Sequence, residues 1–154
     1  VFMGPDLTLE DYTALKLFLD GRGKGYTSVV AYRERSLTPV EAILISPDYA
    51  ANFRGAEFSG LAAGNLTDAY EGALHRLRTG GFKQVIFVGD RGILSTDVDE
   101  KALSALKAAQ TIAVLTDASS PVASAAKVLF PGRSILEKAG LLINRKSRLQ
   151  YSDR

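Results

Sequence analysis

Two aspartates, Asp90 and Asp117, have the residue type and the place in the sequence to bind a cofactor. Asp90 stands in the stretch "VGDRGIL" and Asp117 ends the stretch "TIAVLTD"; each follows an apolar run. Carboxylates beyond the carboxyl ends of parallel strands can bind a ribose hydroxyl or an amide. An aspartate in that place also accepts backbone N–H bonds and caps the next turn, which is the commoner role. Both roles remain open for Asp90 and Asp117, and we favour the cap.

The second candidate is the polar stretch "SILEKAGLLINRKSRLQ", which follows the apolar run ending at Pro131. Glycine allows close backbone approach or a positive φ, amide side chains both donate and accept, and an arginine presents a planar fork of donors. A solvated C-terminal hairpin would explain such polarity, and so would a surface that meets a cofactor or another protein. The residues that carry this second interpretation are Glu137, Lys138, Gly140, Asn144, Arg148 and Gln150.

Other motifs give weaker signals. The glycine-rich "GRGKG" (21–25) follows a predicted helix and precedes a predicted strand, which is the reverse of the order in a phosphate-binding loop. We therefore interpret it as a helix cap and linker. Ser119 and Ser120 precede Pro121 and are expected to cap a helix. The single histidine, His75, falls inside a predicted helix, so a Ser–His–Asp hydrolase is not indicated.

Composition narrows the class of protein. The 154 residues suit one α/β domain spanning 1–154, and the net charge of +2 gives no overall field for nucleic acid. The sequence has no cysteine, so it has no thiolate ligands for zinc or an iron–sulfur cluster, and we expect no metal site. No apolar run approaches the roughly 20 residues of a membrane span. We expect a cytoplasmic protein.

The elements that must position these residues follow from the apolar spacing. Helices are predicted from Thr8, with Asp11 completing a capping box, and in the stretches 67–81, 98–109 and 120–128. The segment 38–45 fits a helix or a strand, and 51–65 is predicted to be a loop or a broken helix.

Strands are predicted at 27–32, 84–90, 111–117 and 128–131. The last three are continuous apolar runs that alternate with helices, which indicates strands buried on both faces. The sequence therefore predicts an α/β fold: a three-layer domain whose mainly parallel sheet is covered by helices.

The C-terminal motif resembles the molybdopterin-oxidoreductase family and, within it, the G subunits of NADH-quinone oxidoreductase, respiratory complex I. That family has an Ala-Asp-Val-Val-Leu-Pro strand followed by Glu-Lys-x-Gly and Asn-x-Glu-Gly-Arg-x-Gln. Here the strand is "AKVLFP" (126–131), and "ANFRGAEFSG" resembles the Asn-x-x-Gly turn of the family at Asn52 and Gly55, with a further glycine at Gly60. The later matches are Glu137, Lys138, Gly140, Asn144, Arg148 and Gln150.

The sequence departs from the family pattern at four positions. Lys127 replaces the usual Asp, Leu142 the usual aromatic residue, Lys146 the usual Glu and Ser147 the usual Gly. The cysteine-rich cluster-binding segment of the family is absent from this sequence.

The resemblance implies a Rossmann-like α/β region of a larger subunit, with structural and interface roles and without a cofactor of its own. The parent enzyme passes electrons from NADH through iron–sulfur clusters to quinone. The implied partners are the remainder of the same subunit and other subunits of the peripheral arm, at the cytoplasmic face of the inner membrane. Direct membrane insertion and nucleic-acid binding are not expected.

A second interpretation takes the protein as a domain of an active molybdenum oxidoreductase. Asp90, Asp117 and the turn at Glu137 and Lys138 would then hold the nucleotide arm of molybdopterin guanine dinucleotide.

Overall fold

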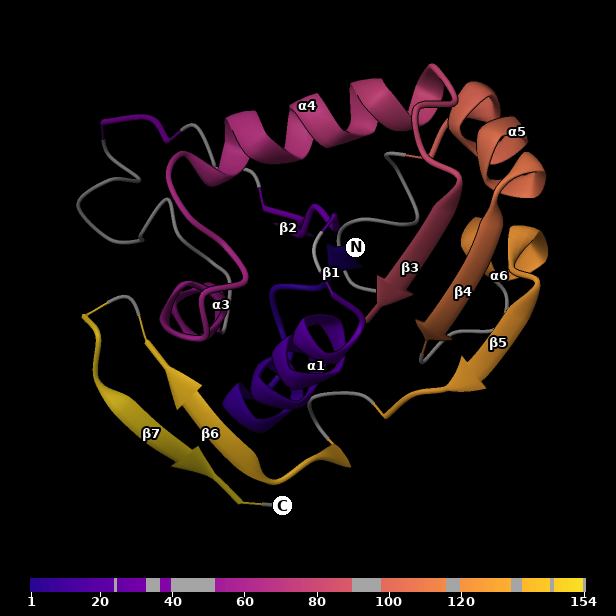
Figure 1. The fold of residues 1–154 in the computed structure, drawn as a ribbon. Coiled ribbons are helices and arrows are strands. Elements are labelled where there is room, and N and C mark those ends of the chain that lie inside the picture. Colours follow the sequence, from indigo (N-terminus) through magenta and orange to yellow (C-terminus); the bar gives the residue numbers. More distant parts are fainter. Residues whose placement is uncertain are drawn as a thin grey trace.

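In the computed structural model the described residues are 1–23, 25–32, 37–39, 52–89, 98–115, 120–133, 137–144 and 146–153. Within them, five parallel strands form a sheet in the order β2-β1-β3-β4-β5, and an antiparallel pair, β6-β7, lies beside it (Figure 1). This confirms the predicted α/β fold with a mainly parallel sheet. The strands are β1 (Phe2–Met3), β2 (Val29–Val30), β3 (Gln84–Val88), β4 (Gln110–Leu115), β5 (Val128–Pro131), β6 (Gly140–Ile143) and β7 (Leu149–Ser152).

The helices begin where the sequence offers side-chain caps. Thr8 and Asp11 form the predicted capping box at the start of α1, and the Ser120 hydroxyl accepts the Ala123 N–H at the start of α6. The described helices are α1 (Leu9–Gly21), α3 (Phe53–Phe58), α4 (Leu66–Arg78), α5 (Glu100–Ala108) and α6 (Pro121–Ala125).

Several predicted boundaries need correction. The N-terminal apolar run, for which no strand was predicted, forms the central strand β1. Gly21 is the last residue of α1, and the left-handed turn falls at Gly23, with φ of 89°. The segment 51–65, predicted to be a loop or a broken helix, contains the short helix α3, which agrees with the second alternative. Residues 40–45 of the ambiguous segment, and the predicted cap Ser119, lie outside the described residues.

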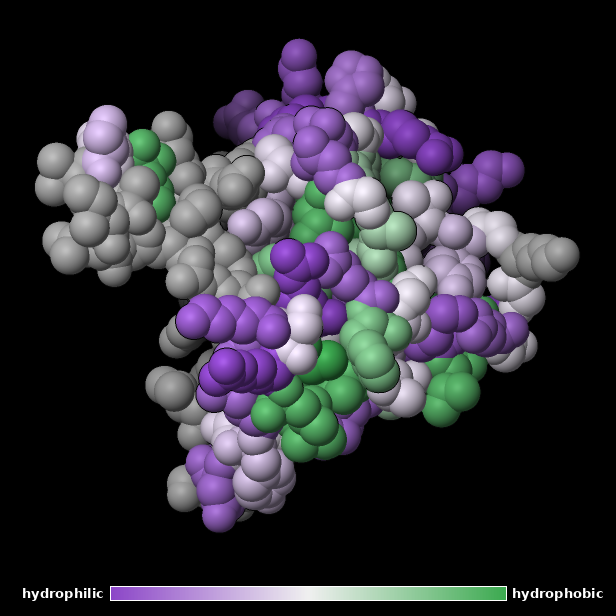
Figure 2. All heavy atoms as spheres, turned by 90° about the vertical axis from the view of Figure 1, so that its left-hand side faces the viewer, coloured by the Kyte–Doolittle hydropathy of each residue, from purple (hydrophilic) through white to green (hydrophobic). Residues whose placement is uncertain are grey.

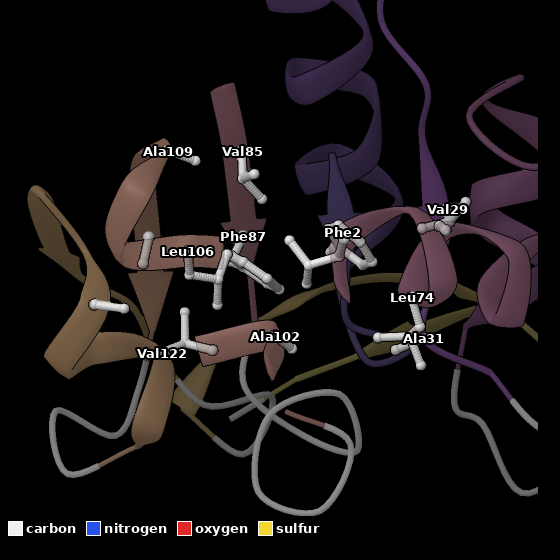
Figure 3. Packing of buried hydrophobic residues seen from close by; sticks show 14 of the residues in the cluster. Phe2, Val29, Ala31, Leu74, Val85, Phe87, Ala102, Leu106, Ala109 and Val122 are labelled. Carbon is white, nitrogen blue, oxygen red and sulfur yellow. The ribbon is translucent and has the colours of Figure 1, made fainter. Parts of the chain in front are cut away.

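α4, α5 and α6 cover one face of the sheet except at the edge strand β5, where Leu129 is 41% exposed. Phe2 and Phe87 come from adjacent strands and stack with ring centroids 4.9 Å apart. Figure 3 shows them on the side of the sheet where Leu74 of α4 and Leu106 of α5 also lie. Phe87 and Leu106 are completely buried, so this face forms the larger hydrophobic core.

The opposite face is covered only in part. α1 and α3 bury Met3 and Val30, and Val88 packs at the margin of this second cluster. Farther along the same face the sheet is exposed: solvent reaches 37% of Ile112, 44% of Val128 and 52% of Phe130. We call these last three residues, on β4 and β5, the open strip. The prediction of strands buried on both faces is wrong at the open strip.

The β6-β7 hairpin packs against α1 and α3, on the second face of the sheet (Figure 1). Ile143 of β6 is buried, whereas Leu149 and Tyr151 of β7 are exposed. The polar C-terminal stretch is therefore a hairpin attached to the α/β layers by one of its strands.

Candidate functional site

The polar C-terminal motif meets the start of α1. The Lys138 ammonium donates to Asp11 Oδ2 over 2.8 Å, and both side chains are partly buried. The same Asp11 oxygen accepts the Thr8 N–H of the capping box at 3.0 Å. One carboxylate thus serves the helix cap and the contact with the hairpin, and the negative charge near the helix N-terminus is favourable in its own right.

The edge of β6 is held by side chains rather than by another strand. Leu141 N–H lies 3.0 Å from Glu10 Oε2 and 3.2 Å from Oε1. Gly140 lies against the helix start, where a Cβ atom would come within 2.7 Å of Thr8 Cγ2. Close approach, rather than a positive φ, is therefore what this glycine provides.

Asn52 links three parts of the chain. Its side chain is completely buried; Nδ2 donates to the Leu7 carbonyl at 2.7 Å, and Oδ1 accepts the Ile143 N–H at 2.6 Å. Its own N–H donates to the Pro5 carbonyl at 3.0 Å. Gly55 is required beside it, because a Cβ there would meet Asn52 Oδ1 at 2.5 Å. We call Glu10, Asp11, Asn52, Lys138 and Gly140 the hairpin junction.

The turn between β6 and β7 is organised by Asn144. Its Oδ1 accepts the N–H groups of Lys146 at 2.9 Å and Arg148 at 3.0 Å, and its Nδ2 donates to Gln150 Oε1 at 3.3 Å. Ser147 has φ of 57°, a left-handed conformation that favours glycine. This is the position where the family pattern has a glycine.

The predicted motif residues therefore divide into two groups. Lys138, Gly140, Asn144 and Gln150 make contacts within the molecule that shape the hairpin or attach it. Exposure does not separate the groups, because Glu137 and Arg148 of the second group and Gln150 of the first all lie at exposed positions. The exposed hydrophobic side chains Phe58 and Leu149 belong to α3 and β7, on the side of the molecule shown in Figure 2, where apolar and polar side chains gather in separate areas.

The two predicted cofactor-binding residues, Asp90 and Asp117, lie outside the described residues. The described structure does show the place where the order of the strands reverses, between β1 and β3. Gly4 and Gly89 meet there, with the Gly4 N–H donating to the Val88 carbonyl at 2.8 Å. Ligands of open α/β sheets bind outside the strand ends at such a point.

Tyr12 supports the loop that leaves β1. Its hydroxyl donates to the Gly4 carbonyl at 2.7 Å. Burial raises the pKa of Tyr12 far above its usual range, and the negative charges of Asp6 and Asp11 act in the same direction. Tyr12 is therefore a neutral hydrogen-bond donor at every ordinary pH.

Sequence reasoning missed the partners of the hairpin. The sequence indicates Glu10 and Asp11 only as part of a helix start, and Asn52 only as part of a turn. The one local signal was the spacing of Asn52 and Gly55, which the structure explains by their direct contact. No group of His, Cys, Asp or Glu among the described residues could hold a metal ion.

No protein-family model matches this sequence, and no curated protein matches it either. Among the described residues there is also no helix with the length and apolarity needed to cross a membrane.

Proposed function

We propose that this protein is a structural and interface segment of a G subunit of NADH-quinone oxidoreductase. The observation that carries the proposal is the hydrogen bond from Ile143 N–H to Asn52 Oδ1, across 91 residues. It joins the Asn-x-x-Gly turn, which resembles the family, to the C-terminal hairpin, which carries the specific part of the resemblance. Two motifs that contact each other support a common origin better than either motif alone.

The chemistry of the hairpin junction suits a scaffold. Both functional atoms of the Asn52 amide are engaged, and Asp11 is shared by a helix cap and Lys138. Groups held in this way resist rearrangement because a buried polar group that loses its partner costs about 1–3 kcal/mol. They hold the hairpin at a fixed position, where the exposed Arg148 and Leu149 are presented to a neighbouring part of the assembly.

Electron transfer belongs to other parts of the proposed parent enzyme. Iron–sulfur clusters need thiolate ligands, and this sequence contains no cysteine. In this proposal the parent subunit carries the clusters, and the partners of the segment are the remainder of that subunit and its neighbours in the peripheral arm. The parent complex would place the segment at the cytoplasmic face of the inner membrane.

An antibody raised against the folded segment tests the proposal in cells that make it. Precipitates from a mild detergent extract are assayed for oxidation of NADH with ferricyanide as the electron acceptor. We expect NADH oxidation in the precipitate and none in a precipitate made with the antibody saturated beforehand by purified segment. A precipitate that contains the segment without NADH oxidation would contradict the proposal.

The point between β1 and β3 favours a second candidate function. There, the backbones of Gly4 and Gly89 approach each other closely, beside the Leu7 side chain, at the usual ligand position of open α/β sheets. A domain of a molybdenum oxidoreductase would bind the guanine nucleotide arm of its cofactor there. Calorimetric titration with GDP separates the candidates: saturable binding supports this one, and no heat of binding at millimolar GDP counts against it.

A further inference from the structure

The second face of the sheet changes from buried to exposed along rows of neighbouring side chains. Side chains of register partners in adjacent parallel strands lie on the same face. The exposed fraction is 0% at Met3 of β1 and reaches 52% at Phe130 of β5. The two rows on this face are Val30, Met3, Val88, Val114 and Phe130, and Ile86, Ile112 and Val128.

The residue types in the open strip do not suit water. When one face of a sheet stays in contact with water, apolar residues that point to the core alternate along each strand with polar residues that point to the water. Ile112, Val128 and Phe130 are instead apolar, and none of the positions in the two rows is charged. At the amino ends of β3 and β4 the rows are preceded by polar residues: Gln84 Nε2 donates to Gln110 Oε1 over 2.9 Å. The strip is therefore an apolar area with polar side chains at one end, like part of the core and rim of an interface.

The open strip has the width of one helix. Adjacent strands lie about 4.8 Å apart, so β4 and β5 together occupy about 10 Å, which is the diameter of a helix with its side chains. On the other face, α5 and α6 contact β4. On the face of the strip, α1 and α3 enclose a cluster that ends at Val88 of β3. Figure 1 shows α1 below β1 and β3, with β4 and β5 extending beyond it.

The exposed apolar area of the strip is too small to hold a second copy of the protein in a stable dimer. The free energy of burying an aliphatic or aromatic side chain, divided by about 25 cal/mol per Å², corresponds to an apolar area on the order of 100 Å² for a fully exposed side chain. The three side chains of the strip, exposed by 37–52%, therefore offer on the order of 130 Å². A stable association of separate proteins buries about 800 Å² on each partner. A helix that belongs to the same polypeptide needs less area, because a linker gives it a millimolar effective concentration.

We propose that the open strip binds an amphipathic helix from the remainder of the same polypeptide, with an aliphatic stripe facing Ile112, Val128 and Phe130. This inference rests on the proposed function, which supplies the rest of the subunit. The helix completes the second helical layer of the sheet, and its flanking polar side chains meet the amides of Gln84 and Gln110.

A fused helix tests this inference in the protein itself. A designed helix of about 14 residues, with leucines along one stripe, is attached after Arg154 through about 20 Gly and Ser residues. It is about 21 Å long, and the linker has an average reach of about 25 Å. The control fusion has the same amino acids with the leucines distributed around the helix. We expect the striped helix to raise the equilibrium constant of folding about tenfold, as measured by urea unfolding.

Matched variants locate the effect. The double variant Ile112→Gln and Phe130→Gln is expected to abolish the gain, and Val128→Thr, which keeps the side-chain shape, to reduce it. The double variant Phe58→Gln and Leu149→Gln changes side chains that are at least as exposed but lie on α3 and β7, and it should retain the full gain. Circular dichroism of the variants without the fused helix checks that each one folds.

Three results would overturn the inference. The striped helix could give no gain over its control, or the gain could survive in the strip variants. Alternatively, sedimentation of the unfused protein could show a dimer that the strip variants dissociate, in which case a second copy covers the strip. The fusion needs no other subunit, so it can succeed when the antibody experiment fails. That combination would refute the proposed parent enzyme and leave the helix-binding strip in place.

Discussion

The two faces of the parallel sheet differ although the same strands form both. Phe87 and Phe130 show the difference: Phe87 is buried under the α4, α5 and α6 layer, whereas Phe130 is about half exposed on the face that α1 and α3 only partly cover. Apolar residues on a strand therefore indicate that its face is suited to burial, but they do not show whether the described helices cover it. The uncovered part of the face would be stabilised most by contact with other protein.

Truncating each phenylalanine gives the largest expected contrast. Phe87→Ala should lower the free energy of unfolding by about 3–5 kcal/mol, because it leaves a cavity in the core. Phe130→Ala should lower it by about 1 kcal/mol or less, since much of that side chain is already in water. Urea unfolding of the two variants measures the difference. Equal losses would mean that the open strip is covered in solution.

The hairpin junction is tested by removing the buried Asn52 side chain and, for comparison, the exposed Asn65 side chain. Asn52→Ala leaves the Leu7 carbonyl and the Ile143 N–H without their partner, so we expect a loss of about 2–4 kcal/mol. Asn65→Ala removes an exposed helix cap and should cost about 1 kcal/mol. Hydrogen exchange at the Ile143 amide should accelerate in the first variant only. Unchanged protection there would show that the hairpin is held in another way.

Two glycines should respond in opposite directions to alanine. At Gly140 the new methyl group meets the Thr8 side chain at 2.7–2.9 Å, and we expect a loss of about 1–3 kcal/mol. At Gly72, inside α4, no atom outside the helix lies within 4 Å of the new methyl group. There alanine should add about 0.5–1 kcal/mol through its helix propensity. Thermal unfolding compares the two, and a gain at both positions would refute the close contact at Gly140.

A smaller change in the free energy of unfolding is expected at Ser147, whose backbone is in the left-handed conformation. Ser147→Gly should raise the free energy of unfolding by about 0.5–1 kcal/mol, because a side chain in this conformation is strained. Ser124→Gly in α6 serves as the control and should lower it by about 0.5 kcal/mol. If both variants lose stability, the turn at Ser147 does not have the conformation described.

Acid should weaken the start of α5 through the protonation of Asp99. The Ala102 N–H, and then Arg78 of α4, hold the pKa of Asp99 below its usual value of about 3.9. The stabilisation is therefore present above the unfolded pKa and is lost as pH falls through the folded pKa. Asp99→Asn keeps a capping side chain but should flatten the pH dependence of unfolding below about pH 4. An unchanged profile would assign that dependence to other carboxyl groups.

The features of the fold that could be predicted from the sequence are those that depend on residues close together in the chain. Thr8 with Asp11, and Ser120 with Pro121, marked helix starts because a capping oxygen and the backbone N–H that donates to it lie within three residues. β1 was missed as a strand because two residues carry no detectable alternation, and its central place depends on pairing with two distant strands.

The contacts of the candidate site could be predicted only in part. Gly140 was expected to allow either close approach or a positive φ, and the structure shows the close approach, beside Thr8. The partner of Ile143 could not be deduced, because one sequence carries no information on which amide 91 residues away is close in space. The open strip was mistaken for buried sheet for the same reason: apolar residues show what a surface prefers, not whether it is covered.

Photo-cross-linking from the open strip tests the central claim most directly. Phe130 is replaced by p-benzoylphenylalanine in cells that make the protein, and the cross-linked peptides are identified by mass spectrometry. Replacement of Phe58, also exposed but on α3, is the control. We expect position 130 to cross-link to one helical segment of its own polypeptide within an NADH-oxidising complex, and position 58 not to cross-link to that segment. Failure of position 130 to cross-link, or its cross-linking only to a second copy of the protein, would show that no helix of the same polypeptide covers the open strip.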